Sequence, residues 1–475
     1  MEKPTQVVIV PSPWFSIQTS FIEFSKRLIQ HSEDLHVTCL IPTFESPSDA
    51  TKALLQTLPS RVHSTFLPPV HYDDLPQGTP KPVQVAPVLF GLTVACSMPY
   101  ICKALQSLSS SSRLVAMVVD QFSSEALICA KELNMLSFIY FPTSAMTLSL
   151  SLNLPKFDQN QTLFNESRDL TQHIEIPGCV PIRVRDIPKP FQDRTSQMYA
   201  FFLERSRKLH VADGILVNSF EGIESGAIRA LREEGSAYPS VYAVGPVIQS
   251  RLDSESKTTK GFECLRWLNT QVPNSVLYVS FGSGGKLSQD QMNELALGLE
   301  LSGKKFLWVV RAPTESSDSV YLSFEDKDPL EFLPDGFIER TKEQGLVVPS
   351  WAPQVEVLGH EAIGGFLSHC GWNSTLESIV NGVPLIAWPL FAEQGMNAAM
   401  LTDGLKVALR PKENEKGLVE RKEVAKVIKR LMEDQEGREI GERMQNLKNV
   451  AAETMQEEGS STKTLIQLSV YLLSK

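Results

Sequence analysis

The chain has 475 residues, of which 42% are hydrophobic and 21% are charged. This is the composition of an ordinary globular protein, and it excludes a disordered chain, a collagen-like repeat and a coiled coil. The formal net charge of −10 at pH 7 argues against a protein that binds nucleic acid or an anionic membrane surface. The length predicts two or three domains, each with its own core.

The N-terminal residues, Met1–Gln6, lead directly into an apolar run, with no basic segment or signal-peptide core before it. No apolar stretch reaches the roughly 20 residues that a membrane-spanning helix needs. The seven cysteines are scattered without a CxxC pair, which favours reduced thiols over a disulfide framework or a zinc site. We therefore expect a cytoplasmic protein without a transmembrane segment.

In the first half, strand-like and helix-like segments alternate. Segment 21–29 has the period of a helix, and five short apolar runs have the length of buried strands: 7–10, 35–41, 114–119, 137–141 and 214–217. Strands that alternate with helices predict right-handed βαβ units around a parallel sheet.

A polar, charged segment, 250–260, interrupts this alternation. The pattern restarts at 275–280 and continues with predicted strands at 306–310, 346–348, 365–367, 384–387 and 407–409. Amphipathic helices are predicted at 330–345, 422–433, 438–455 and 462–473, and a surface loop at 314–329. The predicted fold class is therefore α/β, with two doubly wound domains of similar size.

The start of one predicted helix has the features of an anion site. A strand ends at Ser368-His369, and a helix begins near Asn373. A helix N-terminus offers free N–H groups and the positive end of the helix dipole, which favour a phosphate. His369 adds another donor. Asn, Ser and Thr are also ordinary helix caps, so these residues alone leave both interpretations open.

The wider block from Trp351 to Gln394 resembles the signature box of plant secondary-product UDP-glycosyltransferases. It has the Trp-Ala-Pro-Gln opening, the His-Cys-Gly-Trp-Asn-Ser core and the Glu-Gln close of that box. The chain is most similar to the hydroquinone and monolignol glucosyltransferase branch, and further family landmarks lie at 177–181, 217–220, 279–283 and 333–337.

The resemblance implies the GT-B fold, in which two Rossmann-like domains face each other across a cleft. An N-terminal domain (1–248) would bind the acceptor, and a linker (249–260) would follow it. A C-terminal domain (261–455) would bind the UDP-sugar. The last segment (456–475) would be a helix that packs back on the N-terminal domain.

The resemblance also assigns roles in the donor site. The implied contacts are Trp351 and Ala352 for the uracil, Gln354 and Glu377 for the ribose, Ser283, His369, Trp372, Asn373 and Ser374 for the diphosphate, and Glu393 and Gln394 for the sugar. Gln at the last position resembles glucose users, whereas His there goes with galactose users. A core role for Trp351 and a helix-face role for Glu377 stay open.

The acceptor side departs from the family pattern. The family's general base is a His in a Gly-x-Gly-His turn after the first strand, and an Asp orients it. Here Ile17 stands at the His position, and Trp14 and Ser16 replace the two glycines, while the flanking residues match without a gap. Asp120 matches the orienting Asp, with a strand-end turn residue as the alternative.

Isoleucine cannot accept a proton, and the loss of a general base typically lowers the rate 10²–10⁴-fold. A carboxylic acid arrives ionised, so this loss matters least for acidic acceptors. His71 is an alternative base, although a plain surface-loop His explains it as well. The expected walls of the acceptor pocket are Trp14, Phe15, Ile17, Phe122 and Phe141.

The sequence thus predicts an inverting glycosyltransferase that moves glucose from UDP-glucose to a small aromatic or lipophilic acceptor, an acidic one included. UDP-glucose is the donor substrate, and we expect no metal, no further cofactor, no nucleic-acid partner and a monomeric state. The alternative is a catalytically impaired protein that binds a nucleotide sugar and has lost its base.

Overall fold

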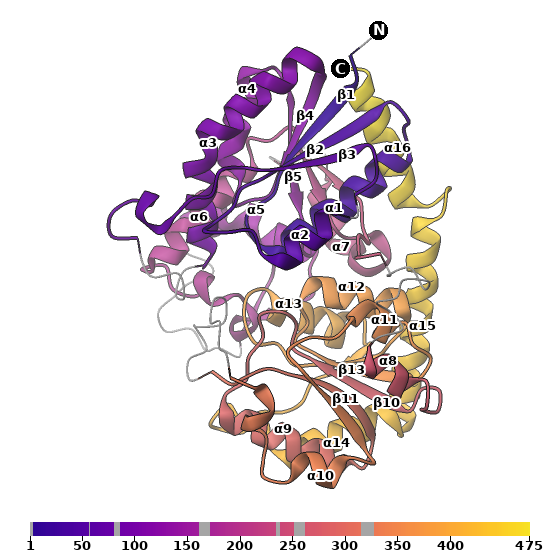
Figure 1. The fold of residues 1–475 in the computed structure, drawn as a ribbon. Coiled ribbons are helices and arrows are strands. Elements are labelled where there is room, and N and C mark those ends of the chain that lie inside the picture. Colours follow the sequence, from indigo (N-terminus) through magenta and orange to yellow (C-terminus); the bar gives the residue numbers. More distant parts are fainter. Residues whose placement is uncertain are drawn as a thin grey trace. The chain divides into compact units, whose positions relative to one another are not determined.

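The computed structural model of the chain describes residues 3–56, 58–79, 86–160, 172–233, 238–250, 262–314 and 327–475. Residue contacts divide it into two units (Figure 1). The N-terminal unit comprises Met1–Val184, Lys189–Gln249 and Glu453–Lys475, and the C-terminal unit comprises Arg185–Pro188 and Ser250–Ala452. Of the predicted linker, all but its first two residues lie outside the described residues.

The N-terminal unit contains a seven-stranded parallel sheet with the strand order β3-β2-β1-β4-β5-β8-β9. The strands are β1 Thr5–Val10, β2 Leu35–Ile41, β3 Val62–Phe66, β4 Arg113–Val119, β5 Leu136–Phe141, β8 Gly214–Val217 and β9 Ser240–Ala243. The helices are α1 Phe15–Gln30, α2 Asp49–Leu55, α3 Ala86–Ser111, α4 Leu127–Glu132, α5 Ala145–Asn160, α6 Gln197–Leu209 and α7 Glu221–Leu231, and a short hairpin pairs β6 His173–Ile174 with β7 Ile182–Arg183. Apolar strand residues such as Val7 and Ile9 are fully buried, which explains their unbroken apolar runs.

The last helix of the chain, α16 (Ser460–Leu473), belongs to the N-terminal unit. Its Leu465 and Leu468 lie in the same buried cluster as the strands of that unit. Arg27 of α1 donates from Nη2 to Ser461 Oγ at 3.1 Å and from Nη1 to the carbonyl of Val244 at 3.0 Å. The closing helix is therefore held by both apolar packing and hydrogen bonds.

A six-stranded parallel sheet with the order β12-β11-β10-β13-β14-β15 forms the C-terminal unit. The strands are β10 Val276–Ser280, β11 Lys305–Val310, β12 Gly345–Pro349, β13 Ile363–Ser368, β14 Leu385–Ala387 and β15 Ala408–Leu409. The helices that begin in this unit are α8 Glu263–Leu268, α9 Gln289–Ser302, α10 Phe337–Thr341, α11 Gln354–Leu358, α12 Trp372–Asn381, α13 Gln394–Ala399, α14 Arg421–Met432 and α15 Gln435–Met455. Both sheets are parallel and both units contain helices, so the predicted α/β class is confirmed.

The helix predicted over 330–345 is wrong as a single element. The structure has a short 3₁₀ turn at Pro329–Phe332, the helix α10, and then the start of β12. Pro334 and Gly336 interrupt the apolar pattern, and Gly336 adopts a left-handed φ of 68°, which a continuous helix does not allow. Most of the predicted surface loop, residues 315–326, lies outside the described residues.

Among the residues that the structure describes, one helix, α3, is long and apolar enough to cross a membrane by length and composition, which differs from the sequence expectation. A core helix of a globular unit passes the same test. Within α3, Leu89, Val94, Ile101 and Leu105 are buried against the rest of the N-terminal unit.

The expectation of seven free thiols is wrong for two of them. Cys102 on α3 and Cys129 on α4 form a disulfide. The two residues lie 27 positions apart, and only the packing of α3 against α4 brings them together, so their spacing in the sequence gives no sign of the bond. The other five cysteines are free thiols.

Candidate active site

Each sheet reverses its strand order at one point, and such switch points are where open α/β sheets bind ligands beyond the strand ends. In the C-terminal unit the reversal lies between β10 and β13, which are followed by Ser283 and His369. In the N-terminal unit it lies between β1 and β4, which are followed by Ile17 and Asp120. The topology therefore places the predicted donor and catalytic residues at the ligand-binding edge of their respective sheets.

The ring of His369 is held between two glycines. A Cβ added to Gly282 would lie 2.5 Å from Nε2 of His369, and one added to Gly371 would lie 2.4 Å from the same atom. These distances are far below van der Waals contact, so neither position tolerates a side chain while the ring stays in place. The glycines in the loops after β10 and β13 thus fix the His369 imidazole at the switch point.

His369 carries an unsatisfied polar atom. Its side chain is nearly buried, and Nδ1 has no hydrogen-bond partner in the described structure. Burial lowers the pKa of the imidazole to about 4, so the ring is neutral at pH 7 and one nitrogen carries a hydrogen. A buried unpaired nitrogen is costly, and a ligand that pairs with it removes this cost.

Next to His369, the helix α12 begins without a side-chain cap. Its N-cap is Gly371, which has no side chain to accept from the first N–H groups. Thr375 Oγ1 is also buried without a partner. Free N–H groups and the positive end of the dipole suit a diphosphate. The predicted contacts Asn373 and Ser374 lie on this first turn, whereas the Trp372 side chain is buried in the unit.

The two residues predicted for the ribose contact each other. Gln354, at the start of α11, donates from Nε2 to Oε2 of Glu377 at 2.7 Å and to Oγ of Ser374 at 2.8 Å. Burial raises the pKa of the Glu377 carboxyl to about 7, against the hydrogen bond from Gln354, which lowers it. Burial thus leaves this carboxyl partly protonated. Further hydrogen-bond donors stabilise its ionised form, and the two hydroxyls of a ribose are such donors.

The predicted uracil platform is accessible. Trp351 follows β12 and is 60% exposed, and its ring lies 5.6 Å from that of Phe262 between centroids. The preceding Ser350 has a left-handed φ of 65°, and its N–H donates to the carbonyl of Val310 at 2.8 Å. Ala352 is buried beside it. The strand end therefore leaves the indole face free for stacking.

The predicted sugar contacts are engaged within the protein. Gln394, the first residue of α13, is buried, and its Oε1 accepts from the N–H groups of Leu390 at 2.9 Å and Phe391 at 3.0 Å. The carbonyl oxygen of Gln394 therefore already accepts two bonds, which leaves its Nε2 group as the donor. Burial raises the pKa of the neighbouring Glu393 carboxyl.

Sequence reasoning missed the segment Arg185–Pro188, which packs in the C-terminal unit although it precedes that unit by some sixty residues in the chain. A Cβ added to Gly395 would lie 2.4 Å from the carbonyl oxygen of Asp186. The Asp186 carboxylate is buried and accepts from Arg410 at 2.7 Å. This ion pair supports the start of α13 and hence the position of Gln394, and no local sequence signal announces it.

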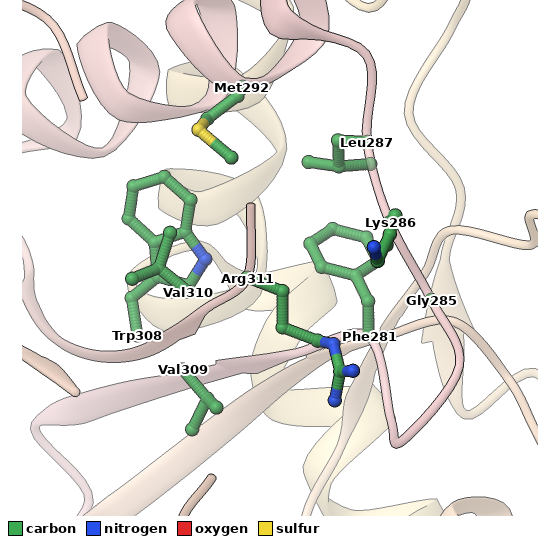
Figure 2. Close-up of a pocket in the computed structure, with 9 residues that line it drawn as sticks. All are labelled: Phe281, Gly285, Lys286, Leu287, Met292, Trp308, Val309, Val310 and Arg311. Carbon is green, nitrogen blue, oxygen red and sulfur yellow. The ribbon is translucent and has the colours of Figure 1, made fainter. Parts of the chain in front are cut away.

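Arg311, directly after β11, is a second residue that the sequence analysis missed. Figure 2 shows it beside a small cavity of about 10 Å³, room for roughly one water, between Phe281, Trp308 and the loop at Gly285. Its Nε is buried without a partner among the described residues, and burial lowers the pKa of the guanidinium. A cation directly after a strand, at the same sheet edge as Ser283, is the signal that would have singled it out.

In the N-terminal unit, the Asp120 carboxylate accepts hydrogen bonds from the loop after β1 and from the turn that follows Asp120 itself. Its Oδ2 accepts from the N–H of Ser12 at 2.6 Å, and its Oδ1 accepts from the N–H groups of Phe122 at 2.7 Å and Ser123 at 3.2 Å. Burial raises the pKa of this carboxyl, and the hydrogen bonds lower it. The carboxylate therefore holds together the loops after β1 and β4.

Ile17 lies on the first turn of α1, which begins at Phe15. Its half-buried side chain packs against the core cluster of the N-terminal unit. The side chain thus joins the apolar packing under the sheet edge and offers no group that titrates.

The predicted pocket walls are only partly brought together. Trp14 lies 5.0 Å from Phe90 between ring centroids, and Phe90 lies 6.2 Å from Phe122. Phe122 stacks at 6.3 Å on Phe201 of α6. Phe90 lies in the apolar helix α3 and Phe201 in the amphipathic helix α6, and the sequence gives no reason to single them out. Two further predicted walls, Phe15 and Phe141, stand apart, since the first is 38% exposed and the second is buried in β5.

Within the described ranges, no three His, Cys, Asp or Glu side chains are grouped so that they could hold a metal ion. The polar groups at both switch points are instead amides, hydroxyls, single carboxylates and one imidazole.

Two parallel α/β units, one with an uncapped helix start and an exposed indole, fit a nucleotide-sugar-dependent transferase of the GT-B class. Solved structures agree. Phytolacca americana UGT2 without ligand has a TM-score of 0.88 at 45% identity, covering 99% of this chain and 100% of that one. A UDP-glucosyltransferase from Polygonum tinctorium, capable of glucosylating indoxyl and solved with 3,4-dichloroaniline, has a TM-score of 0.90 at 42% identity and full coverage of both chains.

Sequence comparison gives the family. A model of UDP-glucoronosyl and UDP-glucosyl transferases matches residues 237–448. Hydroquinone glucosyltransferase of Rauvolfia serpentina is 46% identical over 471 residues, which cover 99% of this chain and 98% of that protein. The chain belongs to the UDP-glucoronosyl and UDP-glucosyl transferase family. It is an enzyme with a UDP-sugar as donor substrate, and the predicted family and GT-B fold are confirmed.

Proposed function

We propose that this enzyme transfers glucose from UDP-glucose to small aromatic acceptors, with inversion at the anomeric carbon, and that readily ionised acceptors react best. The observation that carries the donor part is the unpartnered Nδ1 of His369 beside the uncapped start of α12. The relatives support glucose as the sugar: one is named hydroquinone glucosyltransferase, and Phytolacca americana UGT2 has been solved with UDP-2fluoro-glucose and pterostilbene.

The chain's own groups stabilise the leaving UDP. As the bond between the anomeric carbon and the phosphate oxygen breaks, negative charge grows on the diphosphate. The N–H groups at the start of α12 and the neutral imidazole of His369 donate to this charge, and the Ser283 hydroxyl lies on the neighbouring loop. Donors that are fixed before the reaction are worth most at a developing charge.

The preference for acidic acceptors rests on Ile17 and on the engaged carboxylate of Asp120. An acceptor that arrives as an anion needs no base, whereas a neutral phenol with a pKa near 10 is ionised to only about one part in a thousand at pH 7. The aromatic cluster around Phe90 and Phe122 supports a flat ring as the acceptor body.

The experiment compares benzoic acid with phenol as acceptors that differ in acidity and share one ring. Each is incubated with UDP-glucose, and the glucoside is quantified by mass spectrometry between pH 6 and 9. We expect glucosylated products from both, with a benzoate rate that is flat across this range. UDP-galactose is the matched donor control and is expected to react more slowly. Faster reaction of phenol than of benzoate at pH 6 would overturn the acidic preference.

A catalytically impaired protein that binds the nucleotide sugar is the second candidate. The observation in its favour is the missing base at Ile17 together with an Asp120 carboxylate whose two oxygens already accept backbone bonds. Binding of UDP without any glucoside from a broad acceptor panel would favour it.

We also propose that the enzyme is a cytoplasmic monomer. Five of its seven cysteines are free thiols, as expected in a reducing compartment, and the disulfide between Cys102 and Cys129 is the exception. Fractionation of cells that express the full chain and light scattering of the purified protein test the two statements separately.

A further inference from the structure

A neutral phenol still needs a general base to remove its hydroxyl proton, and Ile17 cannot supply one. The N-terminal unit contains a histidine beside a carboxylate elsewhere in the unit. We propose that His71, oriented by Glu45, is the catalytic base that removes the hydroxyl proton of un-ionised acceptors. The inference rests on the proposed function and adds a residue to it.

His71 and Glu45 form a dyad. Nδ1 of His71 lies 3.0 Å from Oε2 of Glu45, and the other carboxylate oxygen accepts from the N–H of Tyr72 at 3.1 Å. The N–H of His71 donates to Oδ2 of Asp74 at 2.8 Å. The carboxylate favours the tautomer with the imidazole hydrogen on Nδ1, which leaves a lone pair on Nε2, and the side chain is 57% exposed. This is the relation between a base and its orienting group.

Sheet order places the dyad at the acceptor edge. Glu45 follows β2 and His71 follows β3, and in the sheet β3, β2 and β1 are neighbours with parallel direction. A bridge between Phe44 and Val70 extends the pairing past the strand ends, and the N–H of Glu45 donates to the carbonyl of Val70 at 3.0 Å. The dyad and Ile17 therefore lie at the same edge of the sheet, beyond the carboxyl ends of β2, β3 and β1.

A hydrogen bond ties the segment after Glu45 to the first turns of α1. Ser48 caps α2, and Thr51 of that helix donates from Oγ1 to Oε1 of Gln18 at 2.9 Å. Gln18 is the residue after Ile17. Glu45 precedes Ser48 by three residues, a span of at most about 11 Å.

The helix α3 connects the dyad to the aromatic cluster by a second route. Near its middle, Sγ of Cys96 lies 3.6 Å from the carbonyl oxygen of Asp74, in the 3₁₀ turn Tyr72–Asp74 that follows His71. Six residues earlier on α3, Phe90 contacts Trp14. Six residues of helix rise about 9 Å, so α3 links the turn after His71 to the aromatic wall over about that length.

The other described histidines of this unit do not share these features. His31 follows the C-terminal end of α1, and His36 and His63 lie near the start of β2 and β3, at the opposite edge of the sheet. His210 contacts the carbonyl of Leu152, and His173 lies in the β6–β7 hairpin. His71, in contrast, pairs with the carboxylate of Glu45 beyond the carboxyl ends of β2 and β3.

The charges around His71 favour its protonated form. Glu45 raises the pKa of the imidazole above its ordinary value, chiefly through the hydrogen bond, and Asp73 and Asp74 of the following turn add to the rise. From α3, the titratable group near this turn is Cys96. The base acts when deprotonated, so the rate with a neutral acceptor should rise as the pH passes this pKa and then level off.

The step is balanced within the transfer reaction. The acceptor oxygen forms a bond to the anomeric carbon, and the bond from that carbon to the phosphate oxygen breaks with its electron pair on UDP. The hydroxyl proton of the acceptor passes to Nε2 of His71, and the imidazolium then releases it to water.

The test measures kcat/KM from pH 5.5 to 9 with phenol and with benzoate, in the parent, His71→Gln and Glu45→Gln. The matched control is His63→Gln, an exposed histidine on β3. With phenol we expect a sigmoid in the parent and in the control. In His71→Gln the rate at pH 7.5 should fall roughly 10²-fold or more, and the profile should become a tenfold rise per pH unit. Benzoate rates and UDP affinity should not change.

Glu45→Gln keeps the ring and removes the charge, so the midpoint of the phenol sigmoid should move to lower pH, which a purely structural role would not produce. An unchanged phenol profile in His71→Gln overturns the inference, as does a parent profile that already rises tenfold per pH unit. In both cases transfer to benzoate still stands, so the proposed function survives. A parent that glucosylates neither acceptor overturns both.

Discussion

The buried carboxyl of Glu377 makes a quantitative prediction about UDP binding. Burial raises its pKa to about 7 in the free protein. If the ribose hydroxyls donate to the carboxylate, binding favours the ionised form and lowers this pKa. At pH 6 about one tenth of the free protein carries the carboxylate, and at pH 8 about nine tenths does. UDP affinity should therefore rise about tenfold between these pH values, equivalent to about 1.4 kcal/mol.

Isothermal titration calorimetry with UDP at pH 6, 7 and 8 measures this change, and runs in two buffers of different ionisation enthalpy count the protons released. The phosphate of UDP itself ionises near pH 6, so Glu377→Gln is the control that isolates the carboxyl. This variant keeps an acceptor oxygen and cannot titrate. Equal pH dependence in the parent and in Glu377→Gln would refute the assignment of Glu377 to the ribose.

Five further substitutions test the site. Trp351→Ala should weaken UDP binding by roughly 1–3 kcal/mol through lost stacking, and His369→Ala by roughly 1.5–3 kcal/mol through a lost bond to the diphosphate; titration of the folded variants checks both. Gln394→His should lower kcat/KM with UDP-glucose, because it removes the amide donor and both bonds to the preceding loop. Asp186→Ala should reduce the free energy of unfolding by roughly 2–3 kcal/mol, below the value for a fully buried pair because its arginine partner is partly exposed; denaturant melts measure it. Ile17→His should raise phenol activity if Asp120 can turn toward the new ring, and kcat/KM with phenol decides this.

The sequence predicted the two sheets because buried parallel strands leave continuous apolar runs, as at Val7–Val10. The donor residues could be proposed because the block from Trp351 to Gln394 is contiguous and resembles the signature box of the family, and their contacts with the donor stay a prediction. It failed at 330–345, where Pro334 and Gly336 break a pattern that periodicity alone reads as one helix.

What remained out of reach depends on contacts between distant segments. The disulfide between Cys102 and Cys129, the packing of Asp186 in the C-terminal unit and the pairing of His71 with Glu45 each join residues that sequence spacing does not relate. The pKa of Glu377 belongs to the same class, because burial in the folded unit, not the local sequence, raises it.

We expect this chain to couple UDP release to the glucosylation of a small aromatic acceptor. The most direct test incubates the purified chain with UDP-glucose and benzoate at pH 7 and quantifies UDP and glucoside in the same samples over time. Both products should appear in equal amounts, and UDP formation should fall to background without the acceptor. Tight binding of UDP without any glucoside would show that the chain is not this transferase.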